Sequence, residues 1–185
     1  MLGISSGIMY KDYQTYLPPS SYSMSFDGTD DFLAFTATSF PIELTGEDLS
    51  ISFWCKRTDN NDEACVLGHS GTDDYSRINF DDDGNALKIE SDQNGDFAES
   101  SVTDDTDWHH YVITSVGKGT GSGGLSQGTD IMYEDGAAVL TVQANFGKTH
   151  NKDFTVDRIG SDEGSSTTEF KGLIYQLAIF DIALA

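Results

Sequence analysis

From position 22 onward the chain alternates short apolar runs with polar punctuation. In the clearest run, Ile51, Phe53 and Cys55 fall on one side of an extended strand, and Ser52 and Trp54 fall on the other. No window of helical length carries a 3.6-residue period, so the pattern predicts strands throughout. The expected strands are short and rich in β-branched and aromatic residues: Tyr22–Phe26, Phe32–Ala37, Leu49–Arg57, Ala64–His69, Ser76–Phe80, Ala86–Ser91, Trp108–Val116, Asp130–Glu134, Ala137–Val142, Phe154–Gly160 and Gly172–Phe180.

The spacing of these strands and the turns between them predict one all-β domain. Many short strands in 185 residues fit a two-sheet antiparallel β-sandwich or jelly roll. Asp83-Gly84 and Asp135-Gly136 predict hairpin turns, because both central residues of such turns must tolerate positive φ. The Gly/Ser-rich stretch Gly117–Gly128 predicts a long loop between two strands.

The first 21 residues follow a different pattern. They contain no basic leader and no sustained apolar run, so we expect neither a signal peptide nor a membrane span, and folding in a reducing cytoplasm. We expect an N-terminal extended arm over 1–21 that packs on its own sandwich or on another subunit, followed by the sandwich over 22–185. The arm's candidate docking residues are Ile4, Ile8, Tyr10, Tyr13 and Tyr16.

The charge of the chain narrows the classes of partner. Ten Lys and Arg stand against 31 Asp and Glu, which gives a net charge of −21. A field of this sign repels nucleic-acid phosphates and anionic lipid head groups, so we expect no nucleic-acid partner and no membrane partner. It attracts cations and basic protein surfaces, and it tolerates neutral glycans.

Four segments in the same order resemble the laminin-G-like, concanavalin A-type jelly rolls. They are Ser25–Phe32 (SFDGTDDF), Leu49–Trp54 (LSISFW), Trp108–Thr114 (WHHYVIT) with Asp130–Gly136 after it, and Ile159-Gly160 followed by Phe170–Leu184. The resemblance runs from about residue 22 to 185 and implies a concanavalin A-like jelly roll. One departure is Tyr175-Gln176, where the family has an acidic pair, so no role of that pair transfers to this chain.

The resemblance also implies a calcium ion at the rim of the sandwich. The family's ligand is an Asp just before the strand that precedes the Asp-Gly turn, a place that Asp74 and its neighbour Asp73 occupy here. Asn151 and Asp153 could supply further ligands from a late loop. The alternative is that these are solvated loop acids without an ion.

Two other acidic stretches have structural interpretations. Asn79–Glu90 nearly fits the calcium-binding loop of an EF-hand, but its flanks alternate like strands, so we expect a hairpin. Asp27 and Asp30 are expected to shape a turn, although they could also hold a structural ion.

Catalytic signals are weak in this sequence. Glycoside hydrolysis needs two carboxylates flanking the scissile bond, and no strand carries Glu and Asp at alternate positions, Glu90 being the nearest exception. We therefore expect no enzyme. His109 and His110 are expected to pack or to hydrogen-bond within the sheet. Cys55 and Cys65 could form a disulfide between what look like neighbouring strands, but buried thiols are favoured.

Two functional classes remain open, and both share the fold. The favoured one is a virion surface structural protein, such as a phage capsid decoration or fibre-associated subunit. It would be assembled in the host cytoplasm and would dock through its arm onto the major capsid protein or its own copies, with host-surface glycans as further contacts. The alternative is a secreted or cell-surface carbohydrate-binding or adhesion module with a calcium site, located outside the cell.

Overall fold

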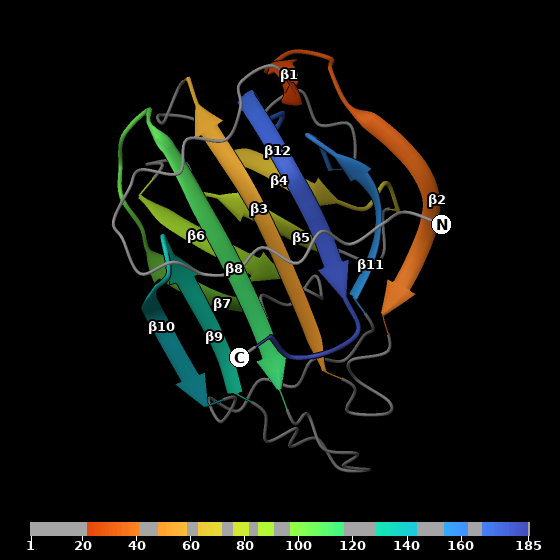
Figure 1. Cartoon of the computed structure of the whole chain (residues 1–185). Helices are drawn as coiled ribbons and strands as arrows, with labels where there is room; N and C mark the ends of the chain where they lie inside the picture. Colours follow the sequence, from red (N-terminus) through yellow and green to blue (C-terminus); the bar gives the residue numbers. More distant parts are fainter. Residues whose placement is uncertain are drawn as a thin grey trace.

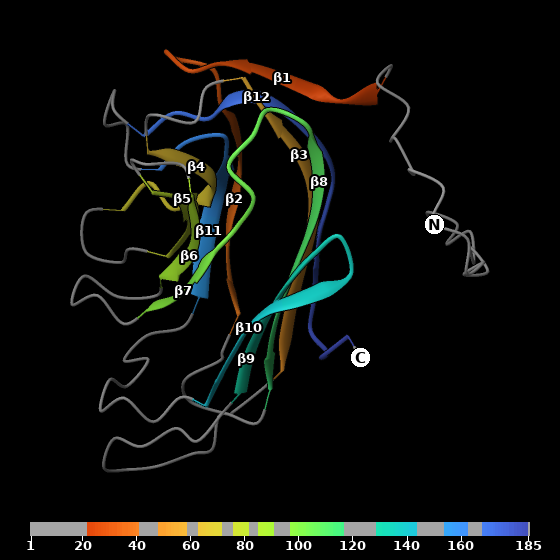
Figure 2. The same ribbon diagram turned by 90° about the vertical axis from the view of Figure 1, so that its left-hand side faces the viewer.

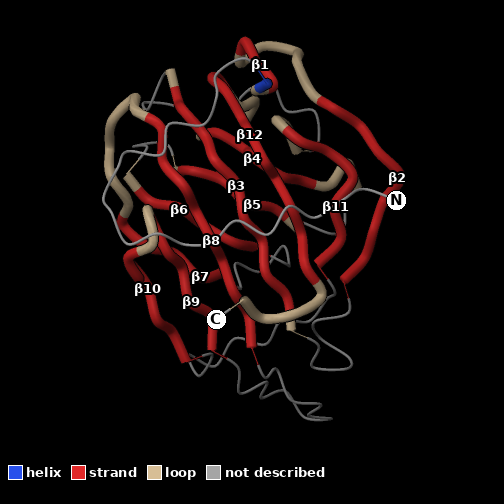
Figure 3. Tube along the Cα trace, viewed as in Figure 1, coloured by secondary structure: helices blue, strands red, loops and turns tan. Residues whose placement is uncertain are grey.

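A computed structural model describes residues 22–40, 48–58, 63–71, 76–81, 85–90, 97–116, 129–143, 154–162 and 168–184. Across these residues, strands form two six-stranded antiparallel sheets that lie face to face as a sandwich (Figure 1 and Figure 2). Strands dominate the part of the chain that is described (Figure 3). The predicted all-β sandwich is confirmed, while the predicted arm lies outside these ranges.

The first sheet, sheet A, places the last strand of the domain between two early ones. Its order is β1-β12-β3-β8-β9-β10. Its strands are β1 (Met24–Asp27), β12 (Lys171–Phe180), β3 (Leu49–Arg57), β8 (Trp108–Val116), β9 (Thr129–Glu134) and β10 (Ala137–Gln143). In Figure 1, β12, β3 and β8 run side by side across the front of the molecule.

The second sheet, sheet B, lies behind the first in Figure 1 and has the order β2-β11-β4-β5-β6-β7. Its strands are β2 (Leu33–Phe40), β11 (Phe154–Ile159), β4 (Ala64–Gly68), β5 (Arg77–Phe80), β6 (Ala86–Glu90) and β7 (Phe97–Ser101). The strand pattern predicted from the sequence is confirmed except for β7, which was missed because FAESS carries little apolar alternation.

The core lies between the sheets and follows the predicted alternation. Ile51 and Phe53 on β3 are fully buried, as are Phe80 on β5 and Phe154 on β11. Tyr111 on β8 joins the two layers, because its ring lies 5.5 Å from the rings of both Phe53 and Phe80. Burying a large apolar side chain of this kind stabilises the fold by about 1.5–3 kcal/mol.

Two turn predictions can be compared with the structure. Asp135 and Gly136 have φ of 51° and 80°, which confirms the tight hairpin between β9 and β10. The strands β5 and β6 pair in antiparallel register, so this segment is a hairpin and not an EF-hand. Residues 82–84, with the Asp83-Gly84 pair, and the stretch Gly117–Gly128 lie outside the described residues.

The two cysteines are buried free thiols, as favoured from the sequence. The expectation that they lie on neighbouring strands is wrong: Cys55 belongs to β3 of sheet A, and Cys65 belongs to β4 of sheet B. The sequence interval was short enough for a hairpin, but the chain crosses from one sheet to the other between these strands.

The edge strand β2 is exposed along nearly its whole length and carries no charged residue. Thr38 pairs with Val156, and Ala34 pairs with Arg158. Three residues of β2 therefore lie opposite a single residue of β11 between these pairs, and the two extra residues form a bulge in β2. A bulge of this kind twists an edge strand away from regular pairing.

No helix in the described ranges is long and apolar enough to span a membrane.

Candidate functional site

The calcium ligands and docking residues predicted from the sequence lie outside the described residues. The calcium set is Asp73, Asp74, Asn151 and Asp153, and the docking set is Ile4, Ile8, Tyr10, Tyr13 and Tyr16. Both stay predictions.

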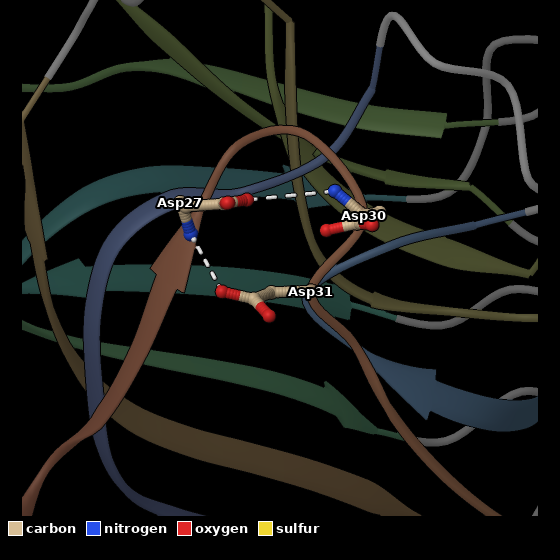
Figure 4. Close-up of side chains that lie close together, drawn as sticks. All are labelled: Asp27, Asp30 and Asp31. Atoms are coloured by element: carbon tan, nitrogen blue, oxygen red, sulfur yellow. Dashed lines mark hydrogen bonds between the residues drawn. The ribbon is translucent and has the colours of Figure 1, made fainter.

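The connection from β1 to β2 is an acidic turn, made by Asp27, Asp30 and Asp31 (Figure 4). Asp27 accepts hydrogen bonds from the backbone N–H of Thr29 at 2.8 Å and of Asp30 at 3.4 Å. Asp31 in turn accepts the N–H of Asp27 at 3.1 Å. The carboxylates therefore shape the turn, as the sequence predicted.

The same turn has the chemistry to hold a cation. One ligand oxygen from each of its three aspartates lies within 4.8 Å of the others, and all three side chains are exposed. Carboxylate oxygens are the ligands that calcium prefers. The acidic turn could therefore hold calcium in addition to closing the loop.

His109, at the start of β8, joins two acidic loops. Its Nδ1 lies 2.8 Å from Asp135 Oδ2, and its Nε2 lies 3.0 Å from Asp105 Oδ1. Carboxylate oxygens accept hydrogen bonds, so both ring nitrogens must carry protons to satisfy both contacts. Burial lowers the pKa of His109, but the hydrogen bonds to Asp135 and Asp105 outweigh it and hold that pKa above its ordinary value.

This geometry predicts a pH-dependent contribution to stability. A histidine whose pKa is raised by folding stabilises the folded state fully at low pH, and this contribution disappears as pH rises through the raised pKa. A His109→Gln variant should lose about 1–2 kcal/mol of unfolding free energy at pH 5.5 and much less at pH 9. Urea unfolding at a series of pH values measures this, and a loss independent of pH would contradict the imidazolium.

The outer face of sheet A is lined by partly exposed residues that do not join the core, here called the aromatic face: Ser52, Trp54, Lys56, Trp108, His110, Val112, Tyr133 and Tyr175. The register places Tyr175, Trp54 and His110 directly opposite one another on β12, β3 and β8. Neighbouring strands lie about 4.8 Å apart, so this row spans roughly 10 Å of surface.

Trp54 and His110 form the centre of that row. Their rings stack with centroids 4.8 Å apart and an angle of 23° between planes. Ser52 Oγ lies 2.9 Å from His110 Nε2. Burial lowers the pKa of His110, opposed by the charge of Asp135, so this imidazole is neutral at neutral pH and can exchange hydrogen bonds as donor and acceptor.

A third group, the arginine cluster, lies on sheet B and consists of Arg77, Glu63, Glu90 and Asp162. Arg77 Nη1 lies 3.1 Å from Glu63 Oε1 and 3.0 Å from Asp162 Oδ2, and its Nε bonds to Glu90. These bonds hold the pKa of Arg77 above its ordinary value against the effect of burial. Glu90 is thus an ion-pair partner, which argues against its use as a catalytic acid.

The aromatic row and the arginine cluster were not predicted from the sequence. The alternation along β3 placed Trp54 opposite the core face of its strand, but the register that brings Tyr175 and His110 beside it joins segments distant in the chain. For Arg77, a signal was available: a basic residue is rare in this acidic sequence, and one at a strand start among acidic loops suggests an ion pair.

Comparison with known proteins identifies the fold and the family. A search of curated proteins finds no match. Among solved structures, a SAP-like pentraxin of Limulus polyphemus is similar with 18% identity, covering 87% of this chain and 76% of its own, at a TM-score of 0.56. The Ruminococcus gnavus sialidase module CBM40, bound to α2,3-sialyllactose, shares 11% identity over 85% of this chain and 93% of its own, at a TM-score of 0.57.

A further similar structure is domain 4 of the Geobacillus stearothermophilus arabinanase AbnA, in complex with arabinotriose. It shares 17% identity over 88% of this chain and 72% of its own, at a TM-score of 0.58. The laminin G family model described as the concanavalin A-like lectin/glucanases superfamily matches residues 27–185. With this match over most of its length, and with the jelly-roll sandwich that the resemblance implied, the chain belongs to the concanavalin A-like lectin/glucanase superfamily.

Proposed function

We propose that this chain is a non-catalytic glycan-binding module that uses the aromatic face of sheet A. The row of Tyr175, Trp54 and His110 carries the proposal, because it sets three aromatic rings in line on a partly exposed sheet surface. Sugar rings present apolar C–H faces and a rim of hydroxyl groups. A surface of aromatic rings with a few placed polar groups is complementary to both.

The polar groups of this surface lie next to the rings. Ser52 and His110 are already hydrogen-bonded to each other, so a hydroxyl group that joins them extends an existing pair. Lys56 lies one position beyond Trp54 on the same face of β3 and opposite Trp108. Both features favour a ligand that combines apolar faces with hydroxyl groups.

The similar structures support a glycan-binding function more than a structural function in a virion. The Ruminococcus gnavus module is bound to sialyllactose, and the Geobacillus stearothermophilus domain is bound to arabinotriose. These structures give no support to the virion role that the sequence favoured. The virion role and the docking of the arm onto capsid protein therefore stay predictions. The proposed function corresponds to the alternative from the sequence, a secreted or cell-surface carbohydrate-binding module. We therefore also propose that the protein is located outside the cell.

Removing the central ring of the row tests the proposal. A glycan array with the full chain should first identify a ligand, and calorimetry should then compare variants. Trp54→Ala and Tyr175→Ala are expected to weaken binding at least about tenfold, because each removes a ring that a bound sugar would cover, and burying a large apolar side chain contributes about 1.5–3 kcal/mol.

Phe35→Ala is the matched control, since it removes an exposed ring from β2 of the other sheet. It should leave the affinity unchanged. Equal affinity in the wild type and Trp54→Ala, with the fold intact by circular dichroism, would exclude the aromatic face as the site.

A further inference from the structure

Gln176 has a strained backbone conformation in the middle of β12. Its φ is 51°, in the left-handed region that residues with a side chain rarely adopt. Among the described residues, the one other residue with a side chain at positive φ is Asp135, which belongs to the tight hairpin between β9 and β10. Gln176 lies inside a strand, where no turn requires this conformation. The strain at Gln176 therefore calls for a different explanation.

A β-bulge contains this residue. Beyond the pair of Tyr175 and Trp54, the register of β12 on β3 shifts, so Gln176 and Leu177 together lie opposite a single residue of β3. Leu177 packs against the core, which makes Gln176 the extra residue of the bulge. Glycine is the usual residue at a left-handed bulge position, because it adopts positive φ without strain. This chain has a long polar side chain there instead.

Neither the bulge nor the core requires that side chain. Register shifts also occur in β2, β4 and β10, and no residue of these three strands has positive φ. An extra residue in a strand of this protein can therefore be accommodated without a left-handed conformation. The Gln176 side chain is exposed, so it adds no buried contact to the core. The strain is retained at a position where the side chain does not stabilise the interior.

Gln176 lies at the open end of the aromatic row. It directly follows Tyr175, whose ring ends the row on β12. On the other side of β12, β1 pairs with Lys171–Ile174, and no described strand pairs there with β12 beyond Ile174. Bulges next to functional sites redirect a side chain. The exposed Gln176 amide is therefore accessible beside the last ring of the row.

We propose that Gln176 is a specificity-determining residue of the aromatic face, whose amide hydrogen-bonds the hydroxyl groups of a sugar that covers Tyr175. This inference rests on the proposed function. The amide offers two N–H donors and one carbonyl acceptor, and each sugar hydroxyl both donates and accepts. A site built to hydrogen-bond a hydroxyl group discriminates against analogues that lack it. The ligand class is an oligosaccharide with adjacent free hydroxyl groups on the sugar at Tyr175.

A Gln176→Gly variant of the full chain should be more stable than the wild type and should bind more weakly. Glycine adopts positive φ without strain, so the melting temperature should rise by about 2–4 °C. Calorimetry with the oligosaccharide that the wild type binds most strongly on a glycan array should show about three- to tenfold lower affinity, because the hydrogen bonds of the amide are lost. Gln176→Glu keeps the length of the side chain but lacks the N–H donors, and its affinity should fall similarly.

Deoxy derivatives of the same oligosaccharide test whether the amide contacts a hydroxyl group. Removal of the hydroxyl group that Gln176 contacts should weaken binding to the wild type and leave binding to Gln176→Gly unchanged, because both changes delete the same hydrogen bond. A purely structural role of Gln176 would lower the affinity for all derivatives by the same factor.

Thr36→Gly is the matched control. Thr36 is also exposed and lies in the bulge of β2, but its φ is not positive. The Thr36→Gly variant should melt at a lower temperature than the wild type, because glycine weakens a strand, and should keep its affinity.

Three results would each overturn the inference: a lower melting temperature of Gln176→Gly, wild-type affinity in either Gln176 variant, or an equal effect of every deoxy derivative on wild type and Gln176→Gly. If Trp54→Ala loses affinity while the Gln176 variants do not, the inference fails and the proposed function stands. A wild type that binds no glycan on the array would overturn both.

Discussion

A Gly172→Ala variant is expected to lose at least about 3 kcal/mol of unfolding free energy, a large part of the 5–15 kcal/mol typical of a domain. Gly172 has a φ of 149°, a backbone conformation that L side chains rarely adopt. A Cβ added there would lie 2.1 Å from the carbonyl oxygen of Lys56 and 3.1 Å from the Cα of Arg57. Both are backbone atoms of β3, and β12 is held between β1 and β3, so neither strand can withdraw without breaking pairing.

Urea unfolding measures this loss, and Gly136→Ala is the matched control. Gly136 also has positive φ, but a Cβ there meets no atom within 4 Å. The Gly136→Ala variant should therefore lose only about 1–2 kcal/mol of unfolding free energy, because a residue with a side chain is strained in the left-handed conformation. Similar losses of unfolding free energy in the two variants would show that the contact with the Lys56 carbonyl contributes little to the destabilisation.

The second large effect is expected from Arg77→Met. Arg77 is the shared partner of Glu63, Glu90 and Asp162, and its side chain is 19% exposed. Removing one partner of a buried ion pair leaves uncompensated charge and typically costs about 3–5 kcal/mol. Methionine keeps most of the volume of the side chain, so the loss reports charge more than packing.

The loss in Arg77→Met should depend on pH, which distinguishes it from a packing defect. Burial already raises the pKa of Glu63 and Arg77 opposes that rise, so removing the guanidinium should raise the pKa further. A carboxyl group whose pKa is raised by folding destabilises the folded state increasingly as pH rises. Unfolding experiments at pH 5 and pH 8 should show the larger loss at pH 8. Lys56→Met, which removes a charge from the partly exposed aromatic face, should show little loss at either pH.

Much of the fold could be predicted from local patterns. The alternation of Ile51, Phe53 and Cys55 predicts the buried face of β3. The pair Asp135-Gly136 predicts the hairpin between β9 and β10, because both residues tolerate positive φ. The edge strand β7 was missed because Phe97–Ser101 carries no such alternation. Local patterns also failed for the cysteines, because strand order within a sheet depends on how the whole chain crosses between layers.

The candidate sites were less predictable, for the same physical reason. The hydrogen bonds of the acidic turn join residues at most four apart, so the sequence could indicate them. The aromatic row and the arginine cluster join segments that are distant in the chain. Composition shows that charges and rings are available, but only the register of the strands shows which of them meet.

The position of β12 between β1 and β3 has a consequence for synthesis on the ribosome. A strand inside sheet A is the last strand of the domain to emerge, so β1 has no partner in its sheet until Lys171–Phe180 has left the exit tunnel. At about 5–20 residues per second, synthesis of the chain between β1 and β12 takes roughly 7 to 30 s. During that interval the nascent chain cannot close sheet A, and β3 presents an unpaired edge to chaperones and to neighbouring nascent chains.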